Sequence, residues 1–190
     1  MMSAVFICYG EVLWDNLPDG AVPGGAPMNV AVRLASVGHR SGMISSVGND
    51  EHGEQLLQFL RSRDVDTSFI QKHPSYPTGE VNVSVDAEGI PSYDIVTPSA
   101  WDGIGVTNDA VTAVRNADGI IFGSLACRSS ESKKTLFRLL EENPYAAFDV
   151  NLRAPFVSLP LVEELMRQSD LIKLNDDELR MICSDTGTDD

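Results

Sequence analysis

The strongest constraint on the fold is the alternation of short apolar, β-type runs with helical stretches along the 190 residues. Residues 4–9 predict a first strand, and residues 42–47 predict a second one. Between them, apolar residues recur at helical spacing after Pro27 and stop at Gly38, a residue type common at helix C-caps. Asp50 then predicts the N-cap of another helix. Such alternation predicts an α/β fold with a mainly parallel sheet flanked by helices.

The same alternation continues in the second half of the chain. Residues 119–122 and 146–150 predict core strands, separated by a helix over residues 130–142. A helix, a strand and a helix then follow, at residues 161–167, 171–174 and 176–182. Because no internal repeat or low-complexity linker divides the chain, we expect a single domain over residues 1–190.

Residues 67–96 interrupt the alternation, because they have no helical period. Residues 80–86 alternate polar with apolar side chains, the segment Ala87-Glu88-Gly89 predicts a turn, and residues 93–96 predict another strand. This pattern predicts a hairpin with one face in water, and hence a small antiparallel sheet inserted in a parallel fold. A substrate lid and a simple extension of the sheet edge both fit the pattern taken alone.

Composition limits the partners that the protein can have. Asp and Glu number 28 against 14 Lys and Arg, and the resulting net charge of −14 would repel nucleic acids and anionic membranes. No stretch approaches the roughly 20 apolar residues of a membrane-spanning helix. Cys8, Cys127 and Cys183 lie far apart in apolar segments, which favours buried thiols over a disulfide framework. We therefore expect a cytoplasmic protein that binds neither nucleic acid nor membrane.

The segment 24–31 (GGAPMNVA) places two glycines immediately before a helix N-terminus. Such a turn brings backbone N–H groups and the positive end of the helix close to a polar ligand. The amide of Asn29 offers donors and acceptors that can pair with neighbouring hydroxyls. Taken alone, the pattern fits an ordinary loop with a solvated Asn29 equally well.

Three further polar segments each have two interpretations from their residues alone. Asp15 follows the first strand, near the edge where open α/β sheets bind ligands, but its surroundings are also typical of a turn. Segment 148–153 (FDVNLR) ends a core strand, and its polar residues fit either a cleft or ordinary contact with water. Asn175 and Glu178 have the spacing of a capping box, while residues three apart on a helix can also point toward one ion.

Together these segments resemble the ribokinase (PfkB) family of carbohydrate kinases. Segment 24–31, followed by Gly38 and Gly48, resembles the first signature of that family, and segment 46–53 (SVGNDEHG) resembles its Val-Gly-x-Asp-x-x-Gly motif. Segment 10–15 (GEVLWD) resembles the start of bacterial fructokinases. The resemblance implies a ribokinase-like fold with a small antiparallel β lid, whose strands are expected within residues 11–22 and 67–97.

The resemblance also implies which residues form the site. The positions that match sugar-binding residues of the family are Asp15, Gly24, Gly25, Asn29, Asn151 and Arg153. Asn175 and Glu178 match an Asn-x-x-Glu motif whose residues act near Mg²⁺ and the ATP phosphates, and Glu178 is expected to contact the metal through water. ATP and Mg²⁺ are therefore the expected cofactors.

The phosphate-binding part of the family pattern is absent from these residues. No Gly-x-Gly-x-x-Gly or Gly-x-x-x-x-Gly-Lys stretch is present, and segment 185–190 does not match the Gly-Ala-Gly-Asp motif that carries the catalytic Asp of the family. The resemblance covers two-thirds of a typical member, so the general base and the anion hole are expected beyond Asp190. We accordingly expect the carboxyl-terminal third to be missing and this chain alone to be inactive.

For an intact protein, the resemblance implies ATP-dependent phosphorylation of a sugar hydroxyl, with fructose as the first choice. A kinase for 2-keto-3-deoxygluconate, ribose or a nucleoside stays an alternative, as does a non-catalytic sugar-binding or regulatory module. A dinucleotide-binding enzyme is disfavoured by the missing glycine fingerprint. The expected partners are a small sugar and ATP, together with a second copy of the chain that associates through the lid strands.

Overall fold

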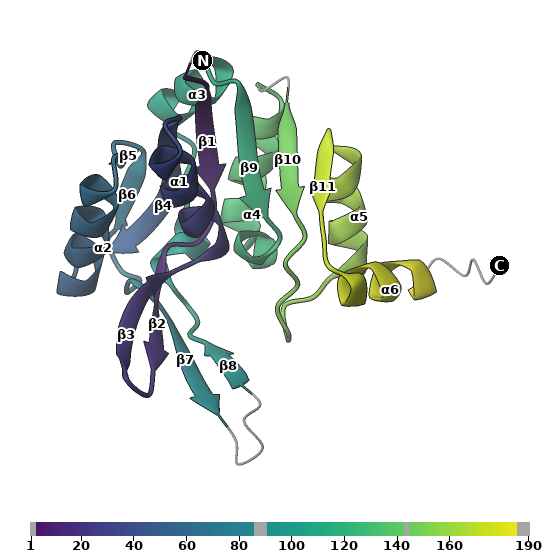
Figure 1. The fold of residues 1–190 in the computed structure, drawn as a ribbon, viewed down its shortest axis with the longest axis horizontal. Helices are drawn as coiled ribbons and strands as arrows, with labels where there is room; N and C mark the ends of the chain where they lie inside the picture. Colours follow the sequence, from purple (N-terminus) through teal and green to yellow (C-terminus); the bar gives the residue numbers. More distant parts are fainter. Residues whose placement is uncertain (1–2, 86–90, 143–144, 186–190) are drawn as a thin grey trace.

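A parallel sheet forms the centre of the protein in a computed structural model that describes residues 3–85, 91–142 and 145–185 (Figure 1). The strand order is β11-β10-β9-β1-β4-β5, and β6 pairs with β4. The strands are β1 (Val5–Tyr9), β4 (Arg40–Gly48), β5 (Val65–Asp66), β6 (Ile70–His73), β9 (Gly119–Gly123), β10 (Ala146–Asp149) and β11 (Leu171–Lys173). Their pairings are parallel, which confirms the predicted fold class.

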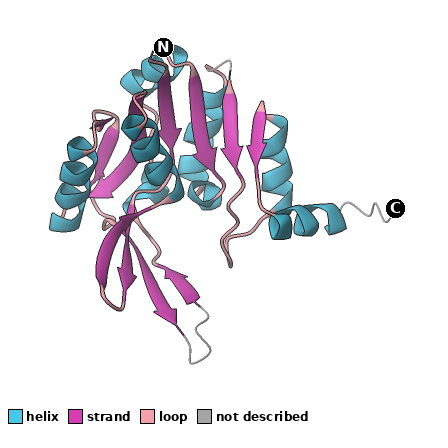
Figure 2. Ribbon diagram, viewed as in Figure 1, coloured by secondary structure: helices cyan, strands magenta, loops and turns pink. Residues whose placement is uncertain are grey.

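Helices cover both faces of this sheet (Figure 2). One face carries α1 (Ala26–Ser36) and α2 (Glu51–Ser62), and the other carries α3 (Asn108–Arg115), α4 (Ser130–Leu140) and α5 (Leu159–Arg167). Neighbouring residues of β1 point to opposite faces, because side chains alternate along a strand. Cys8 therefore packs in the core under α1 and α2, whereas Ile7 packs in the core under α3, α4 and α5.

The helix starts follow the signals in the sequence. The predicted cap Asp50 is the N-cap of α2, and its carboxylate accepts a hydrogen bond from the backbone N–H of Gly53 at 2.8 Å. The same carboxylate accepts from the backbone N–H of Thr78 at 2.9 Å and from its hydroxyl at 2.6 Å. Asp50 thus fixes the start of α2 and also anchors the chain just before it enters the second sheet.

The second sheet has four strands in the order β3-β2-β7-β8 and extends from the end of the main sheet where the strands finish. Its strands are β2 (Leu13–Leu17), β3 (Gly20–Gly24), β7 (Gly79–Val85) and β8 (Pro91–Ile95). The strands β7 and β8 are antiparallel, so the predicted hairpin is present. The predicted turn Ala87-Glu88-Gly89 lies outside the described residues.

This second sheet, called the lid below, differs from the expectation in two ways. It is mixed rather than antiparallel, because β2 and β7 pair in parallel. β2 follows β1 and β7 follows β6, so both begin at the carboxyl ends of parallel strands of the main sheet. Because both run away from that edge side by side, they point in the same direction. In addition, β6 falls inside the predicted lid range 67–97 but pairs with β4, so it belongs to the main sheet.

The cysteine expectation was correct at two positions of three. Cys8 and Cys127 are buried, whereas Cys183 is exposed on α6 (Asp176–Asp185). The apolar segment around Cys183 belongs to a helix at the sheet edge, where Leu179 and Met181 are also exposed.

Across the described ranges, no helix is long and apolar enough to cross a membrane.

Arg128 connects the lid to the α/β core. Its Nε and Nη2 donate to the two carboxylate oxygens of Asp102 at 2.7 and 2.8 Å, and Nη2 also donates to the carbonyl of Val96, just after β8. The guanidinium lies 3.7 Å from the ring centroid of Trp101 and 4.6 Å from that of Phe156. Because Phe156 belongs to the loop after β10, Arg128 holds this loop and the end of the lid together.

Replacing Arg128 should therefore destabilise the fold strongly. Arg128→Met leaves the Asp102 carboxylate buried without its cation, and we expect the free energy of unfolding in urea to fall by about 3–5 kcal/mol. The control is Arg167→Met, which removes an exposed ion pair with Glu163 and should change that free energy by less than about 1 kcal/mol. Equal losses in the two variants would contradict the role assigned to Arg128.

Candidate functional site

A cavity of about 260 Å³ lies where the lid meets the carboxyl ends of the main-sheet strands. From β1 the sheet extends through β4 to β5 on one side and through β9 to β11 on the other, so the strand order reverses beside β1. Open α/β sheets bind ligands at such reversal points. The cavity is lined by Glu11, Leu13, Asp15, Gly25, Ala26, Asn29, Val81, Tyr93, Ile95, Leu125, Asn151 and Arg153.

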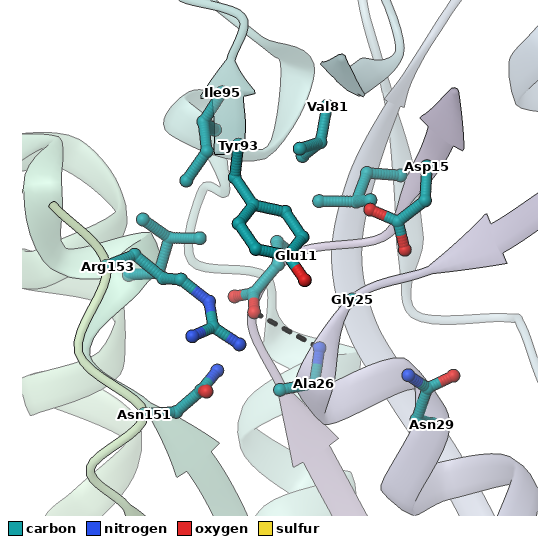
Figure 3. Close-up of a pocket in the computed structure, with 12 residues that line it drawn as sticks. Glu11, Asp15, Gly25, Ala26, Asn29, Val81, Tyr93, Ile95, Asn151 and Arg153 are labelled. Carbon is teal, nitrogen blue, oxygen red and sulfur yellow. Dashed lines mark hydrogen bonds between the residues drawn. The ribbon is translucent and has the colours of Figure 1, made fainter. Parts of the chain in front are cut away.

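This cavity brings together five of the six positions that the sequence predicts to bind sugar, as Figure 3 shows. They come from three separate parts of the chain: the lid, the start of α1 and the loop after β10. The five are Asp15, Gly25, Asn29, Asn151 and Arg153. Gly24, the sixth, does not line the cavity but lies against the carboxylate of Asp15.

The diglycine turn forms one side of the cavity and packs closely against its surroundings, because neither glycine carries a side chain. Gly25 has a φ of 112°, and a Cβ atom there would lie 2.5 Å from the carbonyl oxygen of Glu11. A Cβ atom at Gly24 would collide with the carboxylate of Asp15. The turn can therefore pack against both acidic residues. The helix α1 that follows has no bond from its own N-cap side chain and no acidic residue in its first turn. The carboxylate of Glu11, which accepts from the Ala26 N–H, lies at its positive end instead.

Two carboxyl groups line the cavity. Asp15 lies on lid strand β2 and not at the end of β1, where the sequence placed it. Burial raises the pKa of Asp15, and the charge of Arg153 partly offsets this rise. Glu11 is only 2% exposed, and burial raises its pKa to about 7 against the opposing effect of backbone hydrogen bonds, which include one from Ala26 N–H at 3.3 Å.

Sequence reasoning missed Glu11. One signal could have found it: segment 10–15 sets an acidic residue directly after a core strand, where a carboxylate within apolar neighbours requires a partner. The structure places Glu11 at the floor of the cavity, between the end of β1 and the start of α1.

Asn151 and Arg153 lie on the loop that follows β10. Asn151 has a φ of 38°, a left-handed conformation that asparagine adopts more readily than most residues. The Val150 N–H donates to the carbonyl of Lys173 at 2.9 Å, which fixes the start of the loop against β11. The guanidinium of Arg153 lies 6.0 Å from the ring centroid of Tyr93 on the lid. Among the described lining residues, Arg153 carries the single positive charge.

Asn175 and Glu178 lie outside the cavity lining and form a capping box at the start of α6. The Asn175 side chain accepts from the Glu178 N–H at 2.9 Å, and Glu178 Oε2 accepts from the Asn175 N–H at 2.9 Å. Glu178 Oε1 accepts from the Leu152 N–H, also at 2.9 Å. Glu178 therefore braces the loop that carries Asn151 and Arg153.

These bonds limit how Glu178 could act on a metal ion. Each oxygen of a carboxylate has two lone pairs, so a water-mediated contact with Mg²⁺ fits the residues present. Direct ligation would compete with both backbone bonds. Within residues 3–85, 91–142 and 145–185, no group of three His, Cys, Asp or Glu residues is arranged to hold a metal ion.

Comparisons with known proteins identify similar chains. Residues 17–190 match the family model described as pfkB family carbohydrate kinase. An uncharacterized sugar kinase of Pyrococcus horikoshii is 31% identical over 83% of this chain and 53% of its own length. A fructokinase of Klebsiella pneumoniae is 30% identical over 95% of this chain and 62% of its own length. The chain thus spans little more than half to under two-thirds of these relatives.

Solved structures resemble the whole described fold. The crystal structure of the Pyrococcus sugar kinase has a TM-score of 0.84 at 28% identity and covers 96% of this chain and 66% of its own. It has also been solved in complex with ATP. Fructokinase from Vibrio cholerae, with fructose, ADP and a calcium ion bound, has a TM-score of 0.79 at 26% identity and covers 95% of this chain and 63% of its own.

The diglycine turn gives a first test of the site. Gly25→Ala should lower the free energy of unfolding for two reasons. Alanine is strained at a positive φ, and its Cβ atom would collide with the carbonyl oxygen of Glu11. Gly38→Ala is the matched control, because Gly38 has a φ of 90° but open space around a Cβ atom. We expect the Gly25 variant to lose roughly 1–3 kcal/mol more than the control in urea unfolding. Similar losses would show that the turn is not packed as described.

The brace made by Glu178 gives a second test. Glu178→Gln turns one oxygen into an NH₂ group that faces a backbone N–H, so we expect a loss of about 1–3 kcal/mol in the free energy of unfolding. Asp177→Asn, at an exposed neighbouring position, should lose almost nothing. The loss should be the same with and without MgCl₂. A loss that occurs only with MgCl₂ would make metal binding, rather than the capping box, the role of Glu178.

Proposed function

The chain belongs to the pfkB family of carbohydrate kinases, and from this premise we propose that the protein containing it transfers the γ-phosphoryl group of ATP to a hydroxyl of fructose. The proposal depends on one observation: a single polar cavity collects Asp15, Asn29, Asn151 and Arg153 at the carboxyl ends of the strands. Fructose is the preferred acceptor because relatives named fructokinase cover nearly the whole chain.

The lining side chains suit a neutral polyol. The Asp15 carboxylate can accept hydrogen bonds from two adjacent hydroxyls, and the amides of Asn29 and Asn151 can each donate and accept. Arg153 offers a planar set of donors to hydroxyl oxygens. Leu13, Val81 and Ile95 present an apolar wall from the lid, against which the C–H groups of a sugar ring could pack.

The lid would exclude water when the sugar is bound. Phosphoryl transfer depends mainly on positioning the acceptor and on stabilising charge, and both effects are stronger in a site without bulk water. Within this proposal, the chain's residues bind and orient the sugar hydroxyl. We assign the proton-accepting role to none of the described residues.

ATP and Mg²⁺ belong to the same proposal. Asn175 and Glu178 would lie near the nucleotide phosphates, with Glu178 contacting the ion through water, and Mg²⁺ would neutralise phosphate charge when bound. The Pyrococcus relative solved with ATP supports nucleotide binding by this fold. We further propose a cytoplasmic location, because Cys8 and Cys127 have buried thiols and ATP is the phosphoryl donor.

We also propose that the protein forms a homodimer through the lid. Leu17 and Val22 are 40% and 42% exposed, and the strand register places them on the same face of the lid as Asp15. The exposed ring of Tyr93 belongs to β8, at the other edge of the lid. A second lid packed on these side chains would bury them. Sedimentation of the wild type and of Leu17→Lys distinguishes a dimer from a monomer.

The kinase activity has a direct test in the full-length protein. With saturating Mg-ATP it should phosphorylate fructose faster than ribose, as measured by coupled ADP release. Asp15→Ala should raise the KM for fructose at least about tenfold, because it removes the hydroxyl acceptor and its charge-assisted hydrogen bonds. Asp19→Ala, at the exposed β2–β3 turn, is the control and should keep the wild-type KM.

The outcomes separate the competing functions. Phosphorylation of 2-keto-3-deoxygluconate or ribose in preference to fructose would retain the kinase and change the substrate. Calorimetric binding of fructose without ATP consumption would instead support a non-catalytic sugar-binding module. Failure to phosphorylate any sugar at saturating ATP would reject the kinase assignment.

A further inference from the structure

Glu11 has a buried oxygen that nothing in the described structure satisfies. Its Oε1 accepts the Ala26 N–H at the start of α1, while its Oε2 is buried without a hydrogen-bond partner among the described residues. Buried polar atoms in folded proteins nearly always have a partner, and an orphan atom needs an explanation. The position of this orphan, at the floor of the candidate sugar cavity, indicates a functional one.

Tyr93 and Asn151 also line the cavity and carry uncharged donors, but only one charged group near Glu11 can pair with its carboxylate. Asp149 on β10 and Asp15 on β2 are acidic, and the Cys127 thiol on η2 (Leu125–Arg128) is buried. The start of α1 contributes only backbone groups. Arg153 is the remaining charged group, and its charge stabilises the ionised form of Glu11.

The geometry allows Arg153 to approach. In Figure 3 its guanidinium points toward the carboxyl group of Glu11. The ion pairs among the described residues do not include Arg153. Arg153 is exposed, and its contact with the lid is a distant one, because the ring centroid of Tyr93 lies 6.0 Å from the guanidinium. The side chain is therefore free to turn toward the floor of the cavity.

Resting on the proposed function, we propose that Glu11 is a positioning residue of the sugar cavity: its carboxylate joins the N-terminus of α1 to the Arg153 guanidinium and holds that guanidinium over the sugar. One oxygen fixes the wall formed by the diglycine turn, and the other fixes the wall formed by the loop after β10. With both walls fixed in this way, the cavity keeps the width that the bound sugar requires.

This role requires an ionised Glu11, so it has a pH dependence with a definite sign. The pKa of Glu11 is raised to about 7, and the carboxylate is therefore mostly protonated at pH 6 and mostly ionised at pH 8. Protonation removes the charge that attracts Arg153. Sugar affinity should accordingly fall as the pH is lowered through 7, by about tenfold between pH 8 and pH 6, in line with the ionised fraction.

The first measurement needs no sugar. In full-length protein labelled with δ-¹³C glutamate, the Glu11 resonance, assigned with Glu11→Gln, should titrate near pH 7. Arg153→Met removes the stabilising charge at an exposed position and should move this titration to higher pH. An unchanged Glu11 titration in Arg153→Met would overturn the proposal.

The second measurement is calorimetric fructose binding without nucleotide at pH 6, 7 and 8. Glu11→Gln keeps the size of the side chain and an acceptor for Ala26 N–H, but it carries no charge. We expect a weak affinity that changes less than about twofold with pH, compared with tenfold in the wild type. The control Glu163→Gln, at an exposed position on α5, should keep the wild-type profile. Circular dichroism confirms that each variant is folded.

The outcomes distinguish this proposal from the function on which it rests. A Glu11→Gln variant that keeps the wild-type pH profile would overturn the positioning role even though fructose binds. If the wild type binds no fructose at any pH, the proposed acceptor is wrong. The carbon titrations then decide the link between Glu11 and Arg153 by themselves: a shift supports it and an unchanged titration rejects it.

Discussion

The close packing of the diglycine turn against the chain that leaves β1 is the contact on which the site depends. Gly25 approaches the carbonyl of Glu11 at a distance that leaves no room for a Cβ atom, and Gly24 lies against the carboxylate of Asp15. This packing brings the end of β1, the lid strand β2 and the start of α1 to one place. A larger residue at position 25 would push α1 away from the chain after β1, and one at position 24 would displace the Asp15 carboxylate.

The cavity combines acidic groups with a nearly apolar wall. Glu11 and Asp15 have raised pKa values because both are taken out of water, and Arg153 offsets part of that cost. Charges in such surroundings interact more strongly than they would in water. A single guanidinium among two carboxyl groups suits hydroxyl ligands better than anionic ones, because an anionic sugar would meet more negative than positive charge. This excess of carboxyl groups over cationic groups in the cavity thus agrees with a neutral sugar as the proposed acceptor.

Glu178 and Arg128 show how residues outside the cavity keep its loop in place. Glu178 bonds the backbone of Leu152, and Arg128 packs against Phe156, so each end of this short loop has a separate support. Glu178 was predicted for its place in a cofactor motif, and its observed contacts are those of a capping box. The two roles are compatible, since bonds to backbone amides leave lone pairs for water.

The sequence by itself determined the class of fold, the cap at Asp50 and most of the alternating strands and helices, although it did not predict α3, β5 or β6. These features depend on periods of two and 3.6 residues and on local hydrogen bonds, which neighbouring residues encode. It also indicated Asp15, Asn29, Asn151 and Arg153, through motifs whose members are close in sequence. Only the tertiary structure decided that β2 pairs in parallel with β7, that β6 joins the main sheet, and that Glu11 lies buried opposite Arg153. Those arrangements depend on how segments far apart in the chain pack together. The periodicity of hydrophobic residues within a single segment contains no information about such contacts.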